Sequence, residues 1–179
     1  MKIFDLNGTL IHEDEQALRG GTLKALDLRR SDLEKVEMMG ADLSGSKLDG
    51  SSFDSSFLNG AVLRDVSLEG GFLSDCCLNG ANLSNVDFYE VNAFRASFRG
   101  ADLTNGKFLG CEFSEADFSG ADFEGATFAP DNILHKTSFC GANLATATLT
   151  GATFKDVLYD DNTKFPAGFE PAENGFVRE

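Results

Sequence analysis

Residues 41–60 read ADLSG SKLDG SSFDS SFLNG, four units of five residues that share one pattern. The third residue of each unit is large and apolar, and the first is small. A period of five fits neither the 3.6-residue turn of a helix nor the two-residue alternation of a strand. It fits a solenoid in which each unit forms one flat side and both residues point to the axis. Close packing leaves room for only one large side chain per side, so the second must be small.

The same register extends from Leu23 to Phe128, and Ala93 alone lacks a large apolar side chain at the central position. The dipeptide Gly-Ala begins at residues 40, 60, 80, 100 and 120, and an interval of 20 gives four sides of five residues per coil. Glycine tolerates the backbone angles of such corners. Another Gly-Ala begins at residue 141, which is 21 residues after the one at residue 120. We therefore expect a one-residue insertion, a bulge near 129–138 that includes Pro130, and no long projecting loop.

Several units match the pattern A-(D/N)-L-x-x, among them Ala41–Gly45, Ala81–Asn85 and Ala101–Asn105. In this the chain resembles the pentapeptide-repeat proteins, from about Leu23 to Phe154. The resemblance implies an all-β fold, a right-handed quadrilateral parallel β-helix. About seven coils at a strand spacing of ~4.8 Å would form a rod ~33 Å long. Its two ends would expose strand edges and core, so we expect a cap at each terminus.

The expected organisation comprises an N-terminal β-hairpin cap over 1–17, the repeat over 18–158 and a C-terminal capping tail over 159–179. Within the N-terminal cap, a pair of apolar arms flanks Asn7-Gly8, the strongest short signal for a type I′ hairpin turn. Within the tail, proline and glycine prevent another coil. The aromatic residues of the tail can cover the final coil; they are Phe165, Phe169 and Phe176.

The first residues also suggest an enzyme. Residues 4–10, FDLNGTL, resemble the D-x-D-G-T-(L/V) motif of the haloacid-dehalogenase superfamily, which would make Asp5 a nucleophile. However, Asn7 replaces the second acid, so the proton donor to the leaving group is missing. The repeat also begins too soon to leave space for the α/β domain of that superfamily. We therefore expect no enzymatic activity and no catalytic residue.

Composition excludes several classes of partner. The net charge of −14 and the pI of about 4.4 disfavour nucleic acid and anionic membranes, which require lysine and arginine. No segment approaches the ~20 apolar residues of a membrane span, and the N-terminus lacks the apolar core of a signal peptide. The four cysteines lack metal-binding spacing and fit a reducing cytoplasm. His12 and His135 are isolated in the sequence, so we expect no metal or cofactor.

Two groups of outward positions are candidates for a binding surface. Phe57, Phe72, Cys77 and Phe94 flank central positions on two adjoining sides, where apolar side chains favour a protein partner or weak self-association. The alternative is scattered surface apolar residues, which are normal. We expect the chain to be a monomer or a weak homodimer.

The second group is acidic and includes Asp102, Asp117 and Asp122. Resemblance to the family implies a further role, because some members mimic DNA and bind type II topoisomerases such as DNA gyrase. Arg95 and Arg99 interrupt the negative charge in mid-rod. The expected function is a non-catalytic scaffold that binds an unidentified protein, with DNA mimicry as the alternative.

Overall fold

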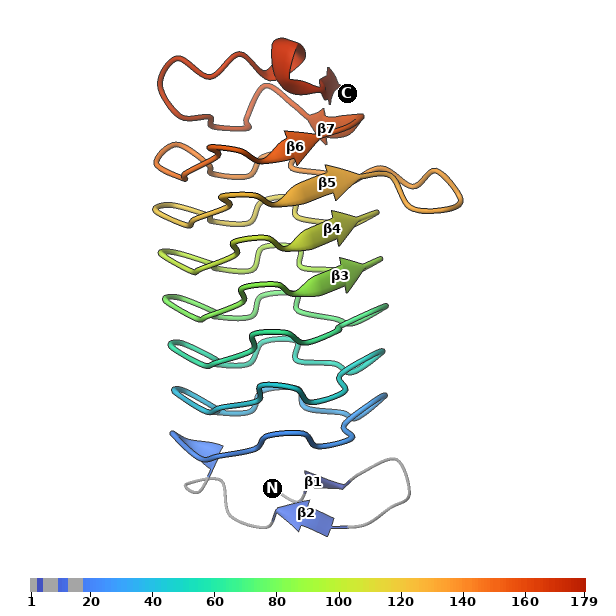
Figure 1. The fold of residues 1–179 in the computed structure, drawn as a ribbon, viewed down its shortest axis with the longest axis vertical. Coiled ribbons are helices and arrows are strands. Elements are labelled where there is room, and N and C mark those ends of the chain that lie inside the picture. The colour runs from blue at the N-terminus through green and yellow to red at the C-terminus, as the bar shows by residue number, and fades with distance from the viewer. Residues whose placement is uncertain (1–2, 5–9, 13–17) are drawn as a thin grey trace.

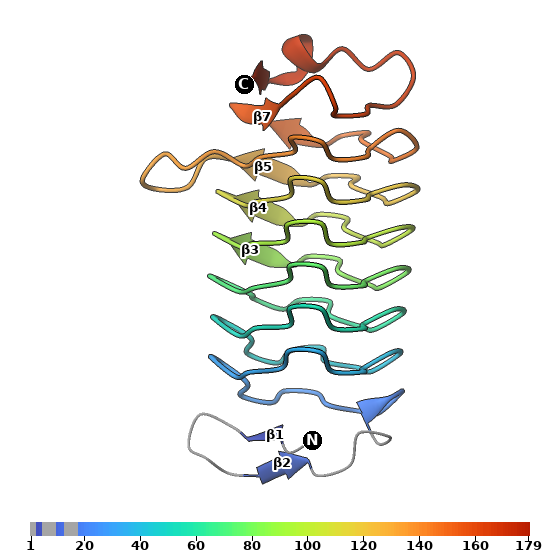
Figure 2. The ribbon, with the colours of Figure 1, turned by 180° about the vertical axis from the view of Figure 1, so that it is seen from behind.

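The computed structural model of the chain describes residues 3–4, 10–12 and 18–179. Residues 18–179 wind into a right-handed coil that rises along one axis, as Figure 1 shows. The view from behind shows the same stack of coils (Figure 2). Among the helices of these residues, none has the length and apolar character needed to cross a bilayer. The all-β, right-handed four-sided helix expected from the repeat is therefore confirmed.

Parallel pairing between successive coils runs in four columns, which we call faces 1 to 4 after the order in which the chain visits them. Up to the pairing of Lys107 with Thr127 the paired residues are 20 apart, so each of these coils has four sides of five residues. The face 1 column has seven members, which agrees with about seven coils. The outward residues of face 1 are Thr22, Asp42, Val62, Asn82, Asp102, Asp122 and Thr148; faces 2, 3 and 4 begin at Asp27, Asp32 and Glu37.

Continuous strands occur on face 2 and at the two ends. On face 2, β3 (Asp87–Tyr89), β4 (Lys107–Leu109), β5 (Thr127–Ala129) and β6 (Thr153–Phe154) form a parallel sheet in that order. At the C-terminal end β7 (Val157–Tyr159) pairs in parallel with β8 (Phe176–Arg178), and the 3-10 helix η1 (Pro171–Asn174) lies between them in the sequence.

The N-terminal end carries a pair of short antiparallel strands. Ile3 of β1 (Ile3–Phe4) pairs with His12 of β2 (Leu10–His12), and Phe4 pairs with Leu10. Figure 1 places both strands at the end of the rod where the first coil begins. Antiparallel pairing is what a hairpin cap requires. The expected Asn7-Gly8 turn lies outside the described residues, as does Asp5, and the boundary of this cap at residue 17 stays a prediction.

The interior consists of the large central residues, all pointing inward as the register predicts. Leucine predominates up to Leu83 and phenylalanine from Phe88 onward, and each is almost fully buried as far as Leu144. Phenylalanines one coil apart stack: Phe108 and Phe128 on face 2 have ring centroids 4.7 Å apart, and Phe98 and Phe118 on face 4 are 4.9 Å apart. Such pairs contribute ~0.5–1.5 kcal/mol beyond the area they bury.

Where the small inward residues are polar, their side chains form hydrogen bonds with the backbone. The buried Ser56 hydroxyl donates to the Leu33 carbonyl at 2.7 Å and accepts from the Val36 amide at 3.0 Å, both in the preceding coil. Ser46 makes the equivalent contacts with Leu23 and Leu26. A small hydroxyl therefore satisfies buried backbone groups that the turns leave unpaired, which explains serine at an otherwise apolar axis.

Corners require a left-handed backbone at the fifth residue of the unit. Gly60 has φ +66°, and Asp65, Asn85 and Arg95 take the same conformation with φ between +55° and +58°. An L-residue there costs roughly 1–2 kcal/mol, which glycine avoids. Glycine is thus favoured at every corner, although aspartate and asparagine tolerate the same angles through local hydrogen bonds.

The expected one-residue insertion was wrong. Asp117 pairs with Asn143 and Asp122 with Thr148, in each case 26 residues apart, so the insertion has six residues. Figure 1 shows the resulting loop projecting from the rod just after β5, whereas no such loop was expected. The interval of 21 does not measure the insertion, because Gly120 and Gly141 occupy different corners. Gly141 stacks on Glu115, at the corner before face 4, rather than on Gly120. We call residues 131–136 the inserted loop.

Aromatic side chains close the C-terminal end of the rod. Phe176 is buried, and its ring centroid lies 4.7 Å from that of Phe154 and 5.1 Å from that of Phe165. Phe165 and Phe169 are partly buried and stack at 5.4 Å. The tail therefore covers the last coil, as its aromatic residues predicted. Pairing of Asn143 with Lys164 extends the coil pattern beyond residue 158, so the predicted boundary of the repeat at that residue is too early.

Candidate functional site

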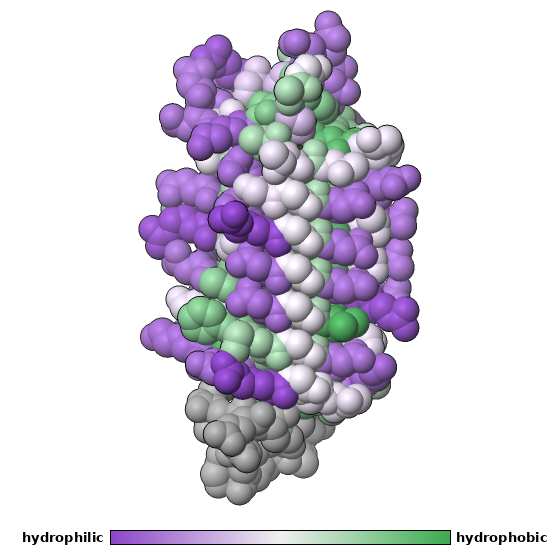
Figure 3. Space-filling model, turned by 90° about the vertical axis from the view of Figure 1, so that its left-hand side faces the viewer, coloured by the Kyte–Doolittle hydropathy of each residue, from purple (hydrophilic) through white to green (hydrophobic). Residues whose placement is uncertain are grey.

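Apolar residues lie outward on two adjoining faces of the rod. Phe57 and Cys77 are paired neighbours on face 4, and Phe72 occupies the same outward position on face 3. The side chains of Phe57 and Phe72 are 44% and 45% exposed, which is unusual for phenylalanine. Figure 3 shows hydrophobic side chains beside the column of small corner residues, on the half of the rod nearer the N-terminus.

Phe94 belongs to the same region but is more covered. It follows the central residue of face 3, and the guanidinium of Arg95 lies 5.0 Å from its ring centroid. Arg95 in turn donates to both carboxylate oxygens of Asp75 at 2.9 Å. These hydrogen bonds lower the pKa of Asp75. Arg95 therefore shields Phe94 rather than simply interrupting the negative charge of the rod.

The three candidate aspartates lie around one corner. Asp102 and Asp122 are paired neighbours on face 1, and Asp117 is on face 4, on the other side of the corner that contains Gly100 and Gly120. Asp117 accepts a hydrogen bond from Asn143 at 3.1 Å and lies 3.7 Å from Arg99. Face 4 thus presents Phe57 and Cys77 in neighbouring coils and Asp117 two coils farther along.

The outward acids also have a local structural role. Asp102 accepts hydrogen bonds from the backbone amide and the hydroxyl of Thr104, at 3.1 and 2.7 Å. Asn82 makes the same two contacts with Ser84, at 3.0 and 2.7 Å. Such Asx turns stabilise these corners and need an oxygen acceptor, not a charge. The turn therefore explains why this position holds aspartate or asparagine. It does not explain why aspartate occurs there rather than asparagine.

The cysteines do not form a site. All four are free, and burial raises the pKa of Cys76 and Cys111 well above the usual range, so both remain protonated thiols. Cys140 is partly exposed; burial, with the nearby Glu179, raises its pKa to about 11. Cys77 contributes its apolar surface to face 4. Cys76, Cys111 and Cys140 are consequently poor nucleophiles.

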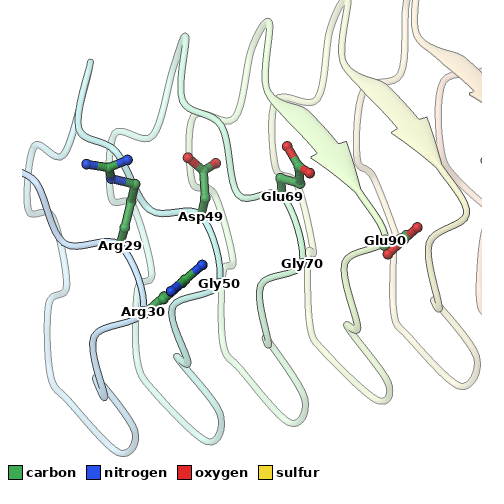
Figure 4. A pocket seen from close by; sticks show the side chains of 7 residues that line it. All are labelled: Arg29, Arg30, Asp49, Gly50, Glu69, Gly70 and Glu90. Carbon is green, nitrogen blue, oxygen red and sulfur yellow. The ribbon is translucent and has the colours of Figure 1, made fainter. Parts of the chain in front are cut away.

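Charged residues line a groove along the corner between faces 2 and 3. Arg29 and Arg30 stand at its N-terminal end, followed by Asp49, Glu69 and Glu90, as Figure 4 shows. Arg29 binds Asp27 at 2.6 Å and lowers the pKa of that carboxyl to about 2. This row is not apparent from the sequence, because its members are 20 or 21 residues apart and no single unit displays them.

The inserted loop begins over the same corner. Asp131 is buried, whereas Ile133 and Leu134 at the loop tip are 68% and 79% exposed. Burial by itself raises the pKa of Asp131, but amide donors at Ile133 and His135 outweigh it and lower the pKa overall. His135 Nδ1 lies 3.1 Å from Asp131 Oδ2. The expectation that His135 is isolated was therefore wrong.

A four-sided β-helix built on a five-residue unit defines a class of solenoid scaffold. The chain belongs to the pentapeptide repeat family, whose model matches eight copies over residues 18–54, 41–85, 61–105 and 96–129. A search of curated proteins gave no match.

Several solved structures are similar. A trypsin-treated variant of QnrB1, a plasmid-mediated fluoroquinolone resistance protein, is 15% identical over 90% of this chain and 84% of its own, with a TM-score of 0.48. Rfr23 from the cyanobacterium Cyanothece 51142 is 17% identical over 82% and 88%, with a TM-score of 0.41. HetL from the cyanobacterium Nostoc sp. strain PCC 7120, which is involved in heterocyst differentiation regulation, is 19% identical over 83% and 82%, with a TM-score of 0.31.

Proposed function

We propose that the protein is a non-catalytic scaffold that binds another protein through faces 3 and 4. The observation that carries this proposal is the exposure of Phe57 and Phe72, which lie on adjoining faces of one rigid rod. Exposed aromatic side chains on a rigid surface lose little conformational entropy on binding and are common anchors of interfaces. The acids at the corner between faces 4 and 1, Asp102, Asp117 and Asp122, would orient a partner that has a complementary basic surface.

Replacement of Phe57 and Phe72 by serine tests this interface. We expect the double variant to fold normally and to bind its partner about 30-fold more weakly, the effect of losing roughly 2 kcal/mol of anchor contacts. The measurement is quantitative recovery of co-purified proteins from the native cell, followed by titration of the recovered partner.

The matched control replaces Ile133 and Leu134 by serine, because these residues are equally apolar and more exposed but lie on the inserted loop. The control should retain the partner. Retention of every partner by the Phe57→Ser/Phe72→Ser variant would reject this interface. Loss of a partner in the control alone would show that the inserted loop is the binding surface. Sedimentation of both variants separates partner binding from self-association.

A second candidate function is mimicry of DNA towards a type II topoisomerase. The observation that favours it is the placement of Asp102, Asp117 and Asp122 around one corner of a rod with a net charge of −14. Duplex DNA carries one charge per ~1.7 Å, which is a similar order of linear density.

Inhibition of DNA gyrase supercoiling tests the mimic. We expect inhibition at micromolar protein, weakened roughly tenfold in the Asp102→Asn/Asp117→Asn/Asp122→Asn variant because exposed charge pairs contribute ~0.2–1 kcal/mol each. Asparagine preserves the Asx turns, as Asn82 demonstrates in the wild-type chain. Absence of inhibition by the wild-type protein would discard the mimic and leave the scaffold proposal intact.

A further inference from the structure

Asp131 anchors the inserted loop and leaves one oxygen unsatisfied. Its side chain is completely buried. Oδ1 accepts hydrogen bonds from the backbone amides of Ile133 and His135, both at 2.8 Å. Oδ2, in contrast, has no hydrogen-bond partner, and no other buried side-chain oxygen or nitrogen of the described chain shares this condition. A buried carboxylate oxygen without a donor is costly, so the site calls for a cation or a proton.

The corner beneath the loop is shaped to bring a second carboxylate close. Gly110 follows Glu90 by one coil at this corner, as the hydrogen bond from the Glu90 amide to the Leu109 carbonyl shows. A Cβ atom on Gly110 would lie 2.9 Å from Asp131 Cβ and 3.1 Å from Oδ2. Because Gly110 has no side chain, the Asp131 side chain has room to approach Glu90. The Asn132 amide also donates to Tyr89 Oη at 3.4 Å, which fixes the loop over this corner.

Three potential ligands converge in this space. One oxygen of Glu90, one of Asp131 and one ring nitrogen of His135 all lie within 4.8 Å of one another. His135 Nδ1 approaches Asp131 Oδ2 to 3.1 Å without forming a hydrogen bond. In the neutral imidazole an unprotonated nitrogen would present its lone pair to a carboxylate oxygen, a repulsive contact unless a cation lies between them.

We propose that Glu90, Asp131 and His135 bind one divalent transition-metal ion, such as Zn²⁺, Co²⁺ or Mn²⁺. Two carboxylates and one imidazole suit these ions, whereas Ca²⁺ and Mg²⁺ prefer oxygen ligands alone. The ion would offset the two negative charges and supply the partner that Oδ2 lacks. Glu90 and His135 are exposed, so water can complete the coordination sphere. The bound ion would fasten the inserted loop, and with it Ile133 and Leu134, to the corner between faces 2 and 3.

Metal titration of the full chain tests the site. The starting protein carries Cys77→Ser and Cys140→Ser, which removes the two partly exposed thiols as competing ligands. With Zn²⁺ in calorimetry and Co²⁺ in visible absorption, we expect one saturable ion per chain and a rise in melting temperature. Glu90→Gln and His135→Ala should each weaken binding roughly tenfold or more, the scale of effect that ligand-shell changes have on metal affinity. Both residues are exposed, so neither change should unfold the protein.

The matched control is His12→Ala, which removes the only other histidine of the chain. Its affinity should equal that of the starting protein. The proposal is overturned if Glu90→Gln and His135→Ala bind Co²⁺ as tightly as the control, or if Ca²⁺ and Mg²⁺ bind as tightly as Zn²⁺. Either result would show that the ions associate only with the acidic surface in general.

Discussion

Phe108→Ala is expected to lower the free energy of unfolding by about 3–5 kcal/mol, the range found for removal of a buried phenylalanine. Phe108 is fully buried, and its ring contacts those of Phe88, Phe113, Phe123 and Phe128. Alanine would leave a cavity among these rings that rigid coils cannot close. Domains are stable by only ~5–15 kcal/mol, so the loss is a large fraction of the total. Urea denaturation followed by circular dichroism measures it.

Phe72→Ala is the matched control, because the same side chain is removed from an outward position that is 45% exposed. We expect a change within about 0.5 kcal/mol, as is usual for surface substitutions. A similar loss of stability in both variants would contradict the assignment of inward and outward positions on which the whole fold rests.

Gly175→Ala is expected to detach the C-terminal cap. Gly175 has φ +84°, and a Cβ atom there would lie 2.1 Å from the carbonyl oxygen of Phe154. The Gly175 carbonyl also accepts the Val157 amide at 3.2 Å. Overpacking costs roughly 1–3 kcal/mol, and the left-handed backbone of a non-glycine residue adds about 1–2 kcal/mol. Displacement of β8 removes Phe176 from the last coil, so we expect lower stability and self-association through the uncovered strand edge.

Gly168→Ala separates the two causes. Gly168 has φ +79° in the same tail, but no atom lies within 4 Å of a Cβ atom built there. This control should lose only the ~1–2 kcal/mol of backbone strain and remain monomeric in light scattering. Equal destabilisation of the two variants would mean that contact between Gly175 and Phe154 does not hold the cap.

The interior of the rod was predictable from the sequence because its geometry is periodic. A unit of five residues with one left-handed corner repeats the same directions, so the inward position of Leu23 determines that of Phe128. The same reasoning correctly placed Phe72 and Phe94 on one face and Phe57 with Cys77 on the next. Position on the rod follows from residue number as long as the period is unbroken.

The insertion was not predictable in the same way. Every corner favours glycine, so the Gly-Ala at 141–142 carries no information about which corner it occupies. A six-residue insertion with the Gly-Ala one corner earlier in the coil gives an interval of 21. A one-residue insertion with the Gly-Ala at the same corner gives the same interval. Only the pairing of Asp117 with Asn143 shows that six residues were added.

The group formed by Glu90, Asp131 and His135 was missed for a related reason. Asp131 and His135 lie in a loop that has no period, and Glu90 is 41 residues before Asp131 in the sequence. The three residues can approach one another only because Gly110 has no side chain. In the sequence Gly110 looks like any other corner glycine. The possible signal was an acid and a histidine four residues apart inside the segment where the pattern breaks.

On the ribosome the leucine-rich coils emerge first and the phenylalanine-rich coils last. A solenoid can begin to fold at any repeat, so the nascent chain first assembles the coils that lack stacked rings. The stacked pairs on faces 2, 3 and 4, such as Phe113 with Phe139 at 5.3 Å, become available only after the leucine-rich coils have emerged. We therefore expect the early coils to remain loosely packed during synthesis. They should become fully packed only after the later, phenylalanine-rich coils have folded.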